Sequence, residues 1–160
     1  MSEISFRRFV PTDAQWVVAR HADLYARDEG FDDTFGAVVG EIIADFCRSH
    51  DPLCEQGWIA ETQGQRIGCI FCVRHTDTIA KLRLFLLTPE ARGRGVGKQL
   101  LQRCMAYAKT AGYSEMTLWT HESHRAACAL YAAFGWQVVD SRPVHSFGVD
   151  LVEQTWKVLL

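Results

Sequence analysis

The sequence predicts a mixed α/β domain, in which a sheet carries helices on both faces, and three observations lead to this prediction. Apolar runs of strand length alternate with segments whose apolar residues recur at helical spacing. The first half of the chain shows helices followed by an antiparallel meander, whereas the second half alternates helix and strand. The chain has 160 residues, 48% hydrophobic and 22% charged, as is ordinary for a globular protein. We therefore expect residues 1–160 to form a single domain.

The first half of the chain is expected to contain a strand, two helices and a hairpin. Pro11-Thr12-Asp13 is a start signal for the first helix, because proline suits the first helical turn and aspartate caps it. Asp51-Pro52 ends the second helix, and Gln63-Gly64 between two apolar runs indicates a hairpin turn. The elements predicted here are a strand at 4–9, helices from 11 to about 27 and from about 34 to 49, and strands at 58–62 and 67–73.

The second half is expected to begin with the central strand of the sheet. Leu84–Leu87 is continuously apolar, which suits a strand covered on both faces. Thr88-Pro89 ends this strand because proline cannot donate to a sheet ladder, and Gly112 and Gly135 each stop a later helix. The elements predicted here are a strand at 82–87, a helix at 96–111, a strand at 116–120, a helix at about 123–134, and strands at 136–141 and 151–159.

A glycine-rich loop (residues 92–98, RGRGVGK) joins this central strand to the next helix. Its glycines let the backbone come close to a ligand, and its amides lie at a helix N-terminus, where the helix dipole favours an anion. Arg92, Arg94 and Lys98 add positive charge. We interpret the loop as a cradle for a pyrophosphate, with a turn that uses glycine for geometry alone as the alternative.

The loop departs from two common phosphate-binding motifs. A Walker loop requires Ser or Thr after its lysine, but Gln99 follows Lys98, and Arg92 stands where the first glycine should be. A dinucleotide fingerprint requires GxGxxG, whereas the glycines here are Gly93, Gly95 and Gly97. The pattern R-x-x-G-x-G after an apolar strand resembles the acetyl-CoA-binding motif of the GNAT superfamily of N-acetyltransferases.

The resemblance covers the whole chain and implies a fold as well as a cofactor. It implies the α+β type of α/β fold: a mixed, mostly antiparallel, twisted sheet of about 6–7 strands, splayed at the centre and flanked by about four helices. Residues 81–97, the segment LYAAFGW and the tail HSFGVDLVEQTW are similar to the acetyltransferase half of bacterial proteins in which a GNAT domain follows a MarR-type winged helix. No winged helix occurs in this sequence, so the resemblance gives no link to transcription.

The resemblance also implies roles for individual residues. Tyr131, in LYAAFGW, matches the tyrosine that protonates the departing CoA thiolate, and a phenol of ordinary pKa suits that role; a tyrosine that only packs on the sheet is the alternative. The position of the usual CoA-contacting asparagine is His124, which can also act as a base or simply start a helix. The expected acetyl-CoA contacts are Phe85, Leu86, Leu87, Arg92, Gly93, Arg94, Gly95, Val96, Gly97, Lys98 and His124.

The acceptor site is less well defined by the sequence. Members that acetylate protein N-termini commonly carry a glutamate where this chain has Trp119, so the general base is open: His121, Glu122, His145 and a water molecule are further candidates. The segment 28–33 (DEGFDD) places four carboxylates around Phe31, and we hypothesise that it attracts a cationic amine; a solvated loop that caps the next helix is the alternative. The expected acceptor contacts are Glu29, Phe31, Trp119 and His145.

Composition excludes several other function classes. A net charge of −2 argues against a nucleic-acid binder, and no apolar run reaches the ~20 residues of a membrane span, so we expect the cytoplasm. Cys69 and Cys72 with His75 imitate a metal site, but in a strand they point to opposite faces, and we expect no metal.

We therefore predict an acetyl-CoA-dependent N-acetyltransferase that acts on a small amine or a lysine-like group. The alternative is a non-catalytic acyl-CoA sensor or interaction module. Transfer of another acyl group, such as succinyl, and a homodimer both stay open.

Overall fold

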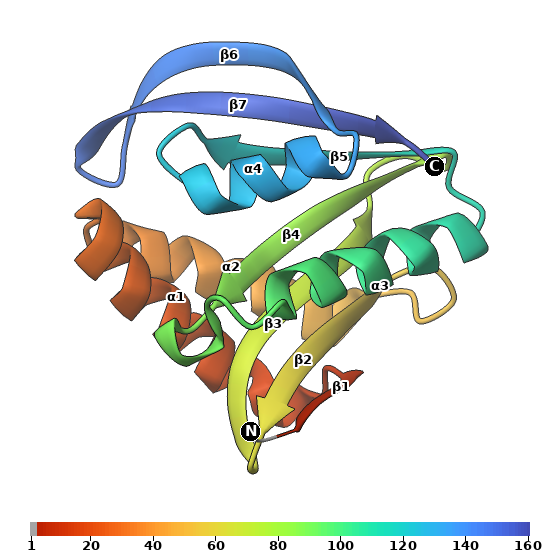
Figure 1. Ribbon diagram of the computed structural model, residues 1–160. Helices are drawn as coiled ribbons and strands as arrows, with labels where there is room; N and C mark the ends of the chain where they lie inside the picture. Colours follow the sequence, from red (N-terminus) through yellow and green to blue (C-terminus); the bar gives the residue numbers. More distant parts are fainter. Residues whose placement is uncertain (1–2) are drawn as a thin grey trace.

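The computed structural model describes residues 3–160, and within them a single twisted sheet of seven strands carries helices on both faces (Figure 1). The sheet order is β1-β2-β3-β4-β5-β7-β6, and all neighbours are antiparallel except β4 and β5. The predicted mixed, mostly antiparallel sheet with about four helices is confirmed. The first two residues of the expected domain, 1 and 2, lie outside the described part.

The elements follow the predicted order, with short 3-10 turns before α1 and after β4. In chain order they are β1 (Ile4–Arg8), η1 (Pro11–Asp13), α1 (Ala14–Glu29), α2 (Asp33–Ser49), β2 (Gln56–Thr62), β3 (Gln65–Arg74), β4 (Ile79–Leu87), η2 (Pro89–Ala91), α3 (Val96–Thr110), β5 (Glu115–His121), α4 (Arg125–Ala133), β6 (Gln137–Ser146) and β7 (Val149–Leu159). The largest boundary error is β6, which continues through Pro143. Because β6 is the outer strand of the sheet, a residue without an amide hydrogen is tolerated there.

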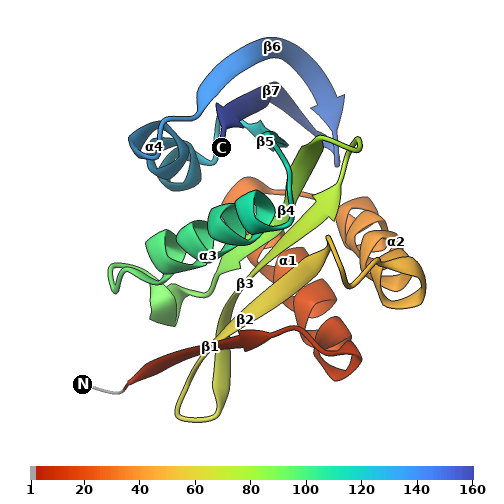
Figure 2. The same cartoon turned by 90° about the vertical axis from the view of Figure 1, so that its right-hand side faces the viewer.

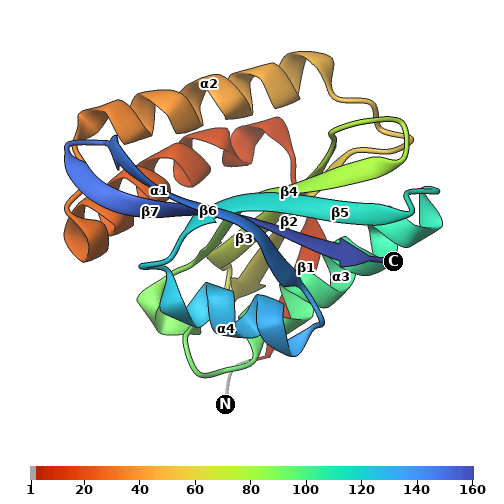
Figure 3. The same ribbon diagram turned by 90° about the horizontal axis from the view of Figure 1, so that it is seen from above.

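The helices α1 and α2 cover one face of the sheet, and α3 and α4 cover the other (Figures 2 and 3). Each layer encloses a hydrophobic core. One core packs α3 and α4 against β2–β5 and β7, and it includes Leu100, Met116 and Trp156. The other packs α1 and α2 against the first half of the sheet, around Val17 and Phe71. Alternation along each strand therefore decides which layer of helices a side chain meets.

The sheet is held together weakly at its centre. β4 and β5 pair only between Ile79–Lys81 and Glu115–Thr117, and beyond these positions the two strands diverge (Figure 1). On the other side of β4, the pairing with β3 shifts register between Cys69 and Phe71, and Leu84 has a left-handed φ of 51°. This irregularity bends β4 away from β5, which gives the splay that the resemblance implies.

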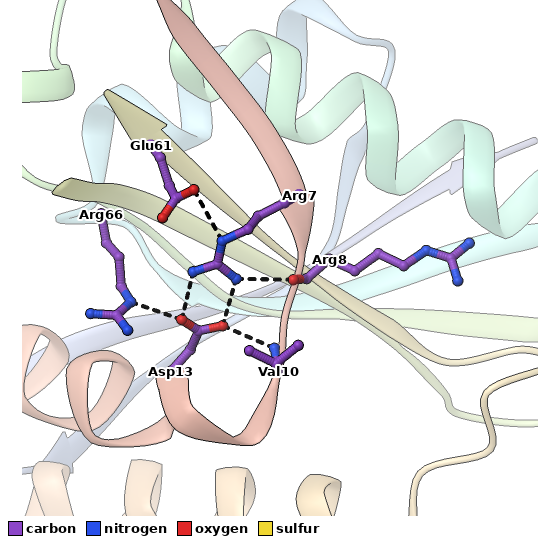
Figure 4. A network of polar contacts seen from close by, with 6 residues as sticks. All are labelled: Arg7, Arg8, Val10, Asp13, Glu61 and Arg66. Carbon is purple, nitrogen blue, oxygen red and sulfur yellow. Dashed lines mark hydrogen bonds and ion pairs between the residues drawn. The ribbon is translucent and has the colours of Figure 1, made fainter. Parts of the chain in front are cut away.

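A buried carboxylate fixes the start of α1 to the sheet (Figure 4). Asp13 is 0% exposed, and it accepts two hydrogen bonds from Arg7 at 2.7 and 2.8 Å and one from Arg66 at 2.7 Å. The amide of Val10 donates a further hydrogen bond to the same carboxylate, at 2.9 Å. Arg7 also pairs with Glu61 at 3.0 Å, so β1, β2, β3 and α1 meet in one network.

Candidate active site

A cavity of about 450 Å³ lies between α1, the end of β4 and the start of α4. It sits beside the splay, because β4 lines it with the residues that follow the β4–β5 pairing. Its lining residues are Leu24, Tyr25, Asp28, Glu29, Phe85, Leu86, Leu87, Arg92, Ser123, His124, Arg125, Ala126, Ala127 and Leu130. Five of the expected acetyl-CoA contacts, Phe85, Leu86, Leu87, Arg92 and His124, thus line one cavity.

The β4 wall of the cavity offers an open strand edge. Leu86 and Leu87 pair with β3 on one side, but among the described residues no strand pairs with them on the side facing β5. Backbone amides and carbonyls on that side are therefore free to bind a ligand that lies along the strand. Phe85 and Leu87 reach towards α3, while Leu86 joins the core under α1, so side chains of the wall pack into both cores.

The glycine-rich loop lies next to this wall and leads directly into α3. Gly93 and Gly95 have φ values of 74° and 75°, a conformation that is strained for any other residue, and no atom lies within 4 Å of the position of a Cβ on either. The backbone of the loop is therefore open from outside. Gly95 begins α3 without a side-chain cap, which leaves the first helical amides available to an anion.

The cations of the loop are placed differently from one another. Arg92 is exposed and pairs with Asp28 of α1 at 3.0 Å, so this ion pair spans the mouth of the cavity. Arg94 donates to the carbonyl of Glu90 at 3.4 Å, and Lys98 is exposed. The open amides and these cations fit a pyrophosphate group without rearrangement of the helix.

One histidine, His124, lines the cavity, and a second, His121, packs against its ring. His124 contacts Thr120 Oγ1 through Nδ1 at 3.1 Å, and its Nε2 lies 3.5 Å from the carboxylate of Glu29. Burial and, to a smaller extent, the neighbouring His121 together lower the pKa of His124 to about 4. A neutral ring beside a carboxylate is best placed with its proton on Nε2 and with Thr120 donating to Nδ1.

An aromatic cluster closes the cavity on the side of the α1–α2 loop. Phe31 is 4% exposed, and its ring packs against Tyr25, Phe35, His121 and Phe147 at centroid distances of 5.0 to 5.7 Å. The amide of Asp32 donates to the carbonyl of Phe147 at 2.9 Å, which joins the α1–α2 loop to the β6–β7 turn. Phe31 is therefore a packing residue in this arrangement, because its ring is too deeply buried to contact an acceptor.

The carboxylates of the 28–33 segment are also engaged. Asp32 caps α2 by accepting a hydrogen bond from the amide of Thr34 at 3.0 Å. Asp28 pairs with Arg92, and Glu29 faces His124, so of the four only Asp33 has no side-chain contact among the described residues. The alternative interpretation of this segment, a loop that caps α2, agrees with the position of Asp32 as the N-cap of that helix.

Tyr131 lies next to the cavity but behind its wall. It is 3% exposed, and its ring contacts those of Phe85, Trp136 and Trp156 at centroid distances of 6.1, 5.7 and 5.8 Å. Its phenol forms no hydrogen bond with any residue between 3 and 160. Burial raises the pKa of Tyr131 well above its ordinary value, and the nearby Tyr25 adds to this, so the phenol keeps its proton at neutral pH.

The structure separates two of the expected acceptor contacts from the cavity. His145 is exposed on β6 and pairs with Asp150 at 2.8 Å, and Trp119 is 59% exposed on β5. Tyr25, Ser123, Ala127 and Leu130 line the cavity but were not expected there. Their helical periodicity placed them on α1 and α4, but the side of each helix that faces β4 depends on packing between distant elements.

The described residues contain no group of three metal-binding side chains that could hold an ion. All six cysteines are free, and Cys69 and Cys72 enter different cores, as expected for residues three apart in a strand. Of the helices in residues 3–160, none combines the length and apolar character that a membrane span needs.

Comparison with known proteins places the chain in one family. Residues 18–136 match the acetyltransferase (GNAT) family. The chain is 32% identical to N-acetyltransferase family 8 member 3 of Rattus norvegicus over 85 residues, covering 50% of this chain and 37% of that protein. It is 31% identical to N-acetyltransferase 8 of Mus musculus over 101 residues, covering 59% of this chain and 44% of that protein. The chain thus spans less than half the length of these relatives.

Solved structures show the same fold at low sequence identity. The yncA protein of Salmonella typhimurium, solved with its cofactor acetyl-CoA, superposes with a TM-score of 0.80 at 17% identity, over 98% of this chain and 94% of that one. A ribosomal-protein-alanine N-acetyltransferase from Brucella melitensis superposes with a TM-score of 0.78 at 17% identity, over 98% of this chain and 99% of that one.

Proposed function

The chain belongs to the acetyltransferase (GNAT) family, and we propose that it transfers an acetyl group from acetyl-CoA directly to a primary amine. One observation carries the proposal: Arg92, the first residue of the glycine-rich loop, and the unpaired edge of β4 line a single cavity, and the open backbone of the loop follows Arg92 directly. The loop amides, Arg92 and Lys98 would hold the pyrophosphate, and the β4 edge at Phe85–Leu87 would bind the pantetheine arm. Acetyl-CoA supplies the thioester, and the chain supplies position and charge.

Transfer needs no covalent bond to the protein. The amine attacks the thioester carbon, the carbon–sulfur bond breaks, and the thiolate leaves with a proton. We propose Tyr131 as the donor of that proton, because its buried phenol stays protonated and lies behind Phe85 at the β4 wall. The amine must first lose a proton, and we propose Glu29 as the base, because its carboxylate lines the cavity while the Nδ1 of the neighbouring His124 already accepts from Thr120.

The test of this function combines binding with turnover. Calorimetry should show binding of CoA, and release of free CoA thiol should follow when acetyl-CoA and a panel of amines are added. In the Tyr131→Phe variant kcat should fall at least tenfold, about 1.4 kcal/mol, with little change in acetyl-CoA affinity. Tyr107→Phe is the matched control, because Tyr107 is another enclosed tyrosine without a hydrogen-bond partner but lies on α3, away from the cavity lining. Full activity of the Tyr131 variant would remove that residue from the mechanism.

A non-catalytic acyl-CoA sensor is the second candidate function. It is favoured by the absence of a glutamate at Trp119 and by the weak basicity of the buried His124. A sensor would bind CoA in calorimetry but release no thiol in a single-turnover assay with mixed amines. Succinyl-CoA in the same assay tests whether a larger acyl group is used.

Several narrower predictions from the sequence rest on motifs alone. The tail HSFGVDLVEQTW supports a closer kinship with the acetyltransferase half of MarR/GNAT fusion proteins. The single domain over residues 1–160, the cytoplasmic location and the homodimer stay predictions, and so does the choice between a small amine and a lysine-like acceptor.

A further inference from the structure

The splay of the sheet has a second face, away from the glycine-rich loop. Along β4 and β5, Ala80, Leu82, Met116 and Leu118 enter the core under α3. Because side chains alternate along a strand, Lys81, Arg83, Thr117 and Trp119 point to the opposite face, on the side of α1 and α2. If acetyl-CoA enters the splay from the side of α3 and α4, the amine must approach from this opposite face. The inference below therefore rests on the proposed acetyl transfer.

Two cations on this face lack a carboxylate partner. Lys81 is 7% exposed and belongs to the last pair that β4 makes with β5, opposite Thr117. Arg83 is half-buried and follows it on the same face of β4. Among residues 3–160, neither side chain forms an ion pair or a side-chain hydrogen bond. Burial of a charge without a counterion is costly, so this arrangement is unusual unless a ligand supplies the counterion.

Carboxylates on β5, on β7 and on α2 are paired with other residues. Glu115 pairs with Lys157 at 4.0 Å, and Glu153 pairs with Arg142 at 3.1 Å. Asp45 of α2 pairs with Arg48. Burial lowers the pKa of the Arg83 guanidinium and the nearby Asp45 opposes this shift, but neither Asp45 nor any other carboxylate of residues 3–160 forms an ion pair with Lys81 or Arg83.

The ammonium of Lys81 is held in place by an indole ring. The Nζ of Lys81 lies 3.4 Å from the centroid of the Trp119 ring, and Trp119 is itself 59% exposed. A cation–π contact positions the ammonium but leaves its charge available to an anion. The exposed part of the ring offers an apolar surface next to it. Burial and, to a smaller extent, the charge of Arg83 together lower the pKa of Lys81 to about 8, and a bound anion would oppose this shift.

We propose that Lys81 and Arg83 bind a carboxylate of the acceptor, with Trp119 packing against its apolar part. The acceptor is then an amino-acid-like molecule that carries a carboxylate as well as the primary amine to be acetylated. This differs from a purely cationic acceptor, such as a polyamine, which the two unpaired cations would repel.

Matched pairs of amines with and without a carboxylate test this proposal. Thiol release is measured for phenylalanine against phenethylamine, tryptophan against tryptamine, and lysine against 1,5-diaminopentane. In the wild-type protein kcat/KM should be at least tenfold higher for the carboxylate-bearing member of the preferred pair. Arg83→Gln and Lys81→Gln should each remove most of that preference by raising KM for the carboxylate-bearing member, while kcat/KM for the decarboxylated partner stays the same or rises, because one repelling charge is removed.

Controls separate this effect from damage to the fold or to the donor site. Arg103→Gln is the matched control, because Arg103 is a cation on α3 that packs over Phe6 on the other face of the sheet. The affinity for acetyl-CoA and the melting temperature should change little in Arg83→Gln. Calorimetry with N-acetylphenylalanine and N-acetyltryptophan, compared with N-acetyltryptamine, measures carboxylate binding without turnover.

The possible outcomes distinguish failure of the acceptor proposal from failure of the proposed acetyl transfer. Equal kcat/KM values within every pair, an unchanged preference in both variants, or no binding and no turnover of any carboxylate-bearing ligand would each overturn the acceptor proposal. In those cases acetyl transfer would still stand if CoA binds and other amines release thiol. If CoA itself gives no heat and no amine releases thiol, the proposed function fails first, and the acceptor proposal fails with it.

Discussion

Asp13, in the turn before α1, and Lys81, on β4, are both buried charged residues, but their surroundings differ completely. Asp13 receives hydrogen bonds from two arginines and from a backbone amide, and the network connects β1, β2, β3 and α1 (Figure 4). Lys81 has an indole ring on one side and a second cation close by. A buried charge that is fully paired serves the fold, whereas one left without a counterion indicates a place for a ligand.

Removing each charge gives the largest test of this contrast. In Asp13→Ala the two arginines lose their shared carboxylate and α1 loses its anchor, so the free energy of unfolding should fall by about 3–5 kcal/mol. In Lys81→Met the free energy should stay within about 1 kcal/mol of the wild type, or rise, because a methionine fills the same space without a charge. Urea unfolding followed by circular dichroism measures both values. A loss in Lys81→Met as large as that in Asp13→Ala would remove the contrast.

Acid should weaken the Asp13 network in a predictable range. Burial alone would raise the pKa of Asp13 above 3.8, but the hydrogen bonds from Arg7, Val10 and Arg66 outweigh it and lower the pKa to about 2. A lowered carboxylate pKa contributes stability above the unfolded value, and this contribution, about 2 kcal/mol, is lost as the pH falls from about 4 to about 2. The difference in unfolding free energy between the wild type and Asp13→Asn should shrink over that range. A constant difference would contradict the assignment.

Alkali should act on Lys81 in the opposite sense. Its pKa falls from 10.5 in the unfolded chain to about 8 in the fold, so between these values the unfolded chain binds more protons. The contribution of Lys81 to stability therefore rises with pH across this range, and any advantage of Lys81→Met over the wild type should shrink by about 1–2 kcal/mol. Binding of N-acetylphenylalanine should weaken above pH 8 in the wild type, and much less in Lys81→Gln. Isothermal titration at pH 7 and pH 9 measures this.

The smallest expected effect concerns the ion pair at the mouth of the cavity. Asp28 holds Arg92, an arginine that the pyrophosphate of CoA would also use. Since both side chains are exposed, the pair contributes less than about 1 kcal/mol, and Asp28→Asn should tighten CoA binding by about two- to fourfold. Asp23→Asn, which removes the carboxylate that pairs with Arg20 on α1, is the control and should leave the affinity unchanged. Weaker CoA binding in Asp28→Asn would assign Asp28 to the binding site itself.

Local signals in the sequence were sufficient for most of the fold. Gln63-Gly64 forms the predicted hairpin turn, with left-handed φ values of 50° and 75°, and Pro89 follows β4 as expected. The order of elements and the glycine-rich loop before α3 are likewise decided by residues that are close together in the sequence. The family resemblance predicted the rest of the fold, including the splay between the central strands, which no local pattern in the sequence specifies.

The acceptor side could not be derived in the same way. Phe31 is flanked by carboxylates in the sequence, which suggested exposure, but its ring lies among Phe35, Phe147 and His121 from three other elements. Whether Lys81 has a counterion depends on which carboxylates the packing of β4 against other elements brings to it, and no carboxylate of residues 3–160 forms an ion pair with it. Such facts arise from pairings between distant segments, and a single sequence without structure does not contain them.

The three paired positions between β4 and β5 have a mechanical consequence. Every other pair of neighbouring strands in the sheet is joined over at least five positions. Within the sheet, the part formed by β5, β7 and β6 is therefore connected to the other strands by the shortest ladder. A ladder this short should open at a lower free energy than the other ladders of the sheet, and the amide protons of the β4–β5 pairing should exchange with solvent before those of the other strand pairs. Local opening of the sheet should therefore be most frequent at the β4–β5 pairing, beside the cavity where we propose that acetyl-CoA enters and leaves.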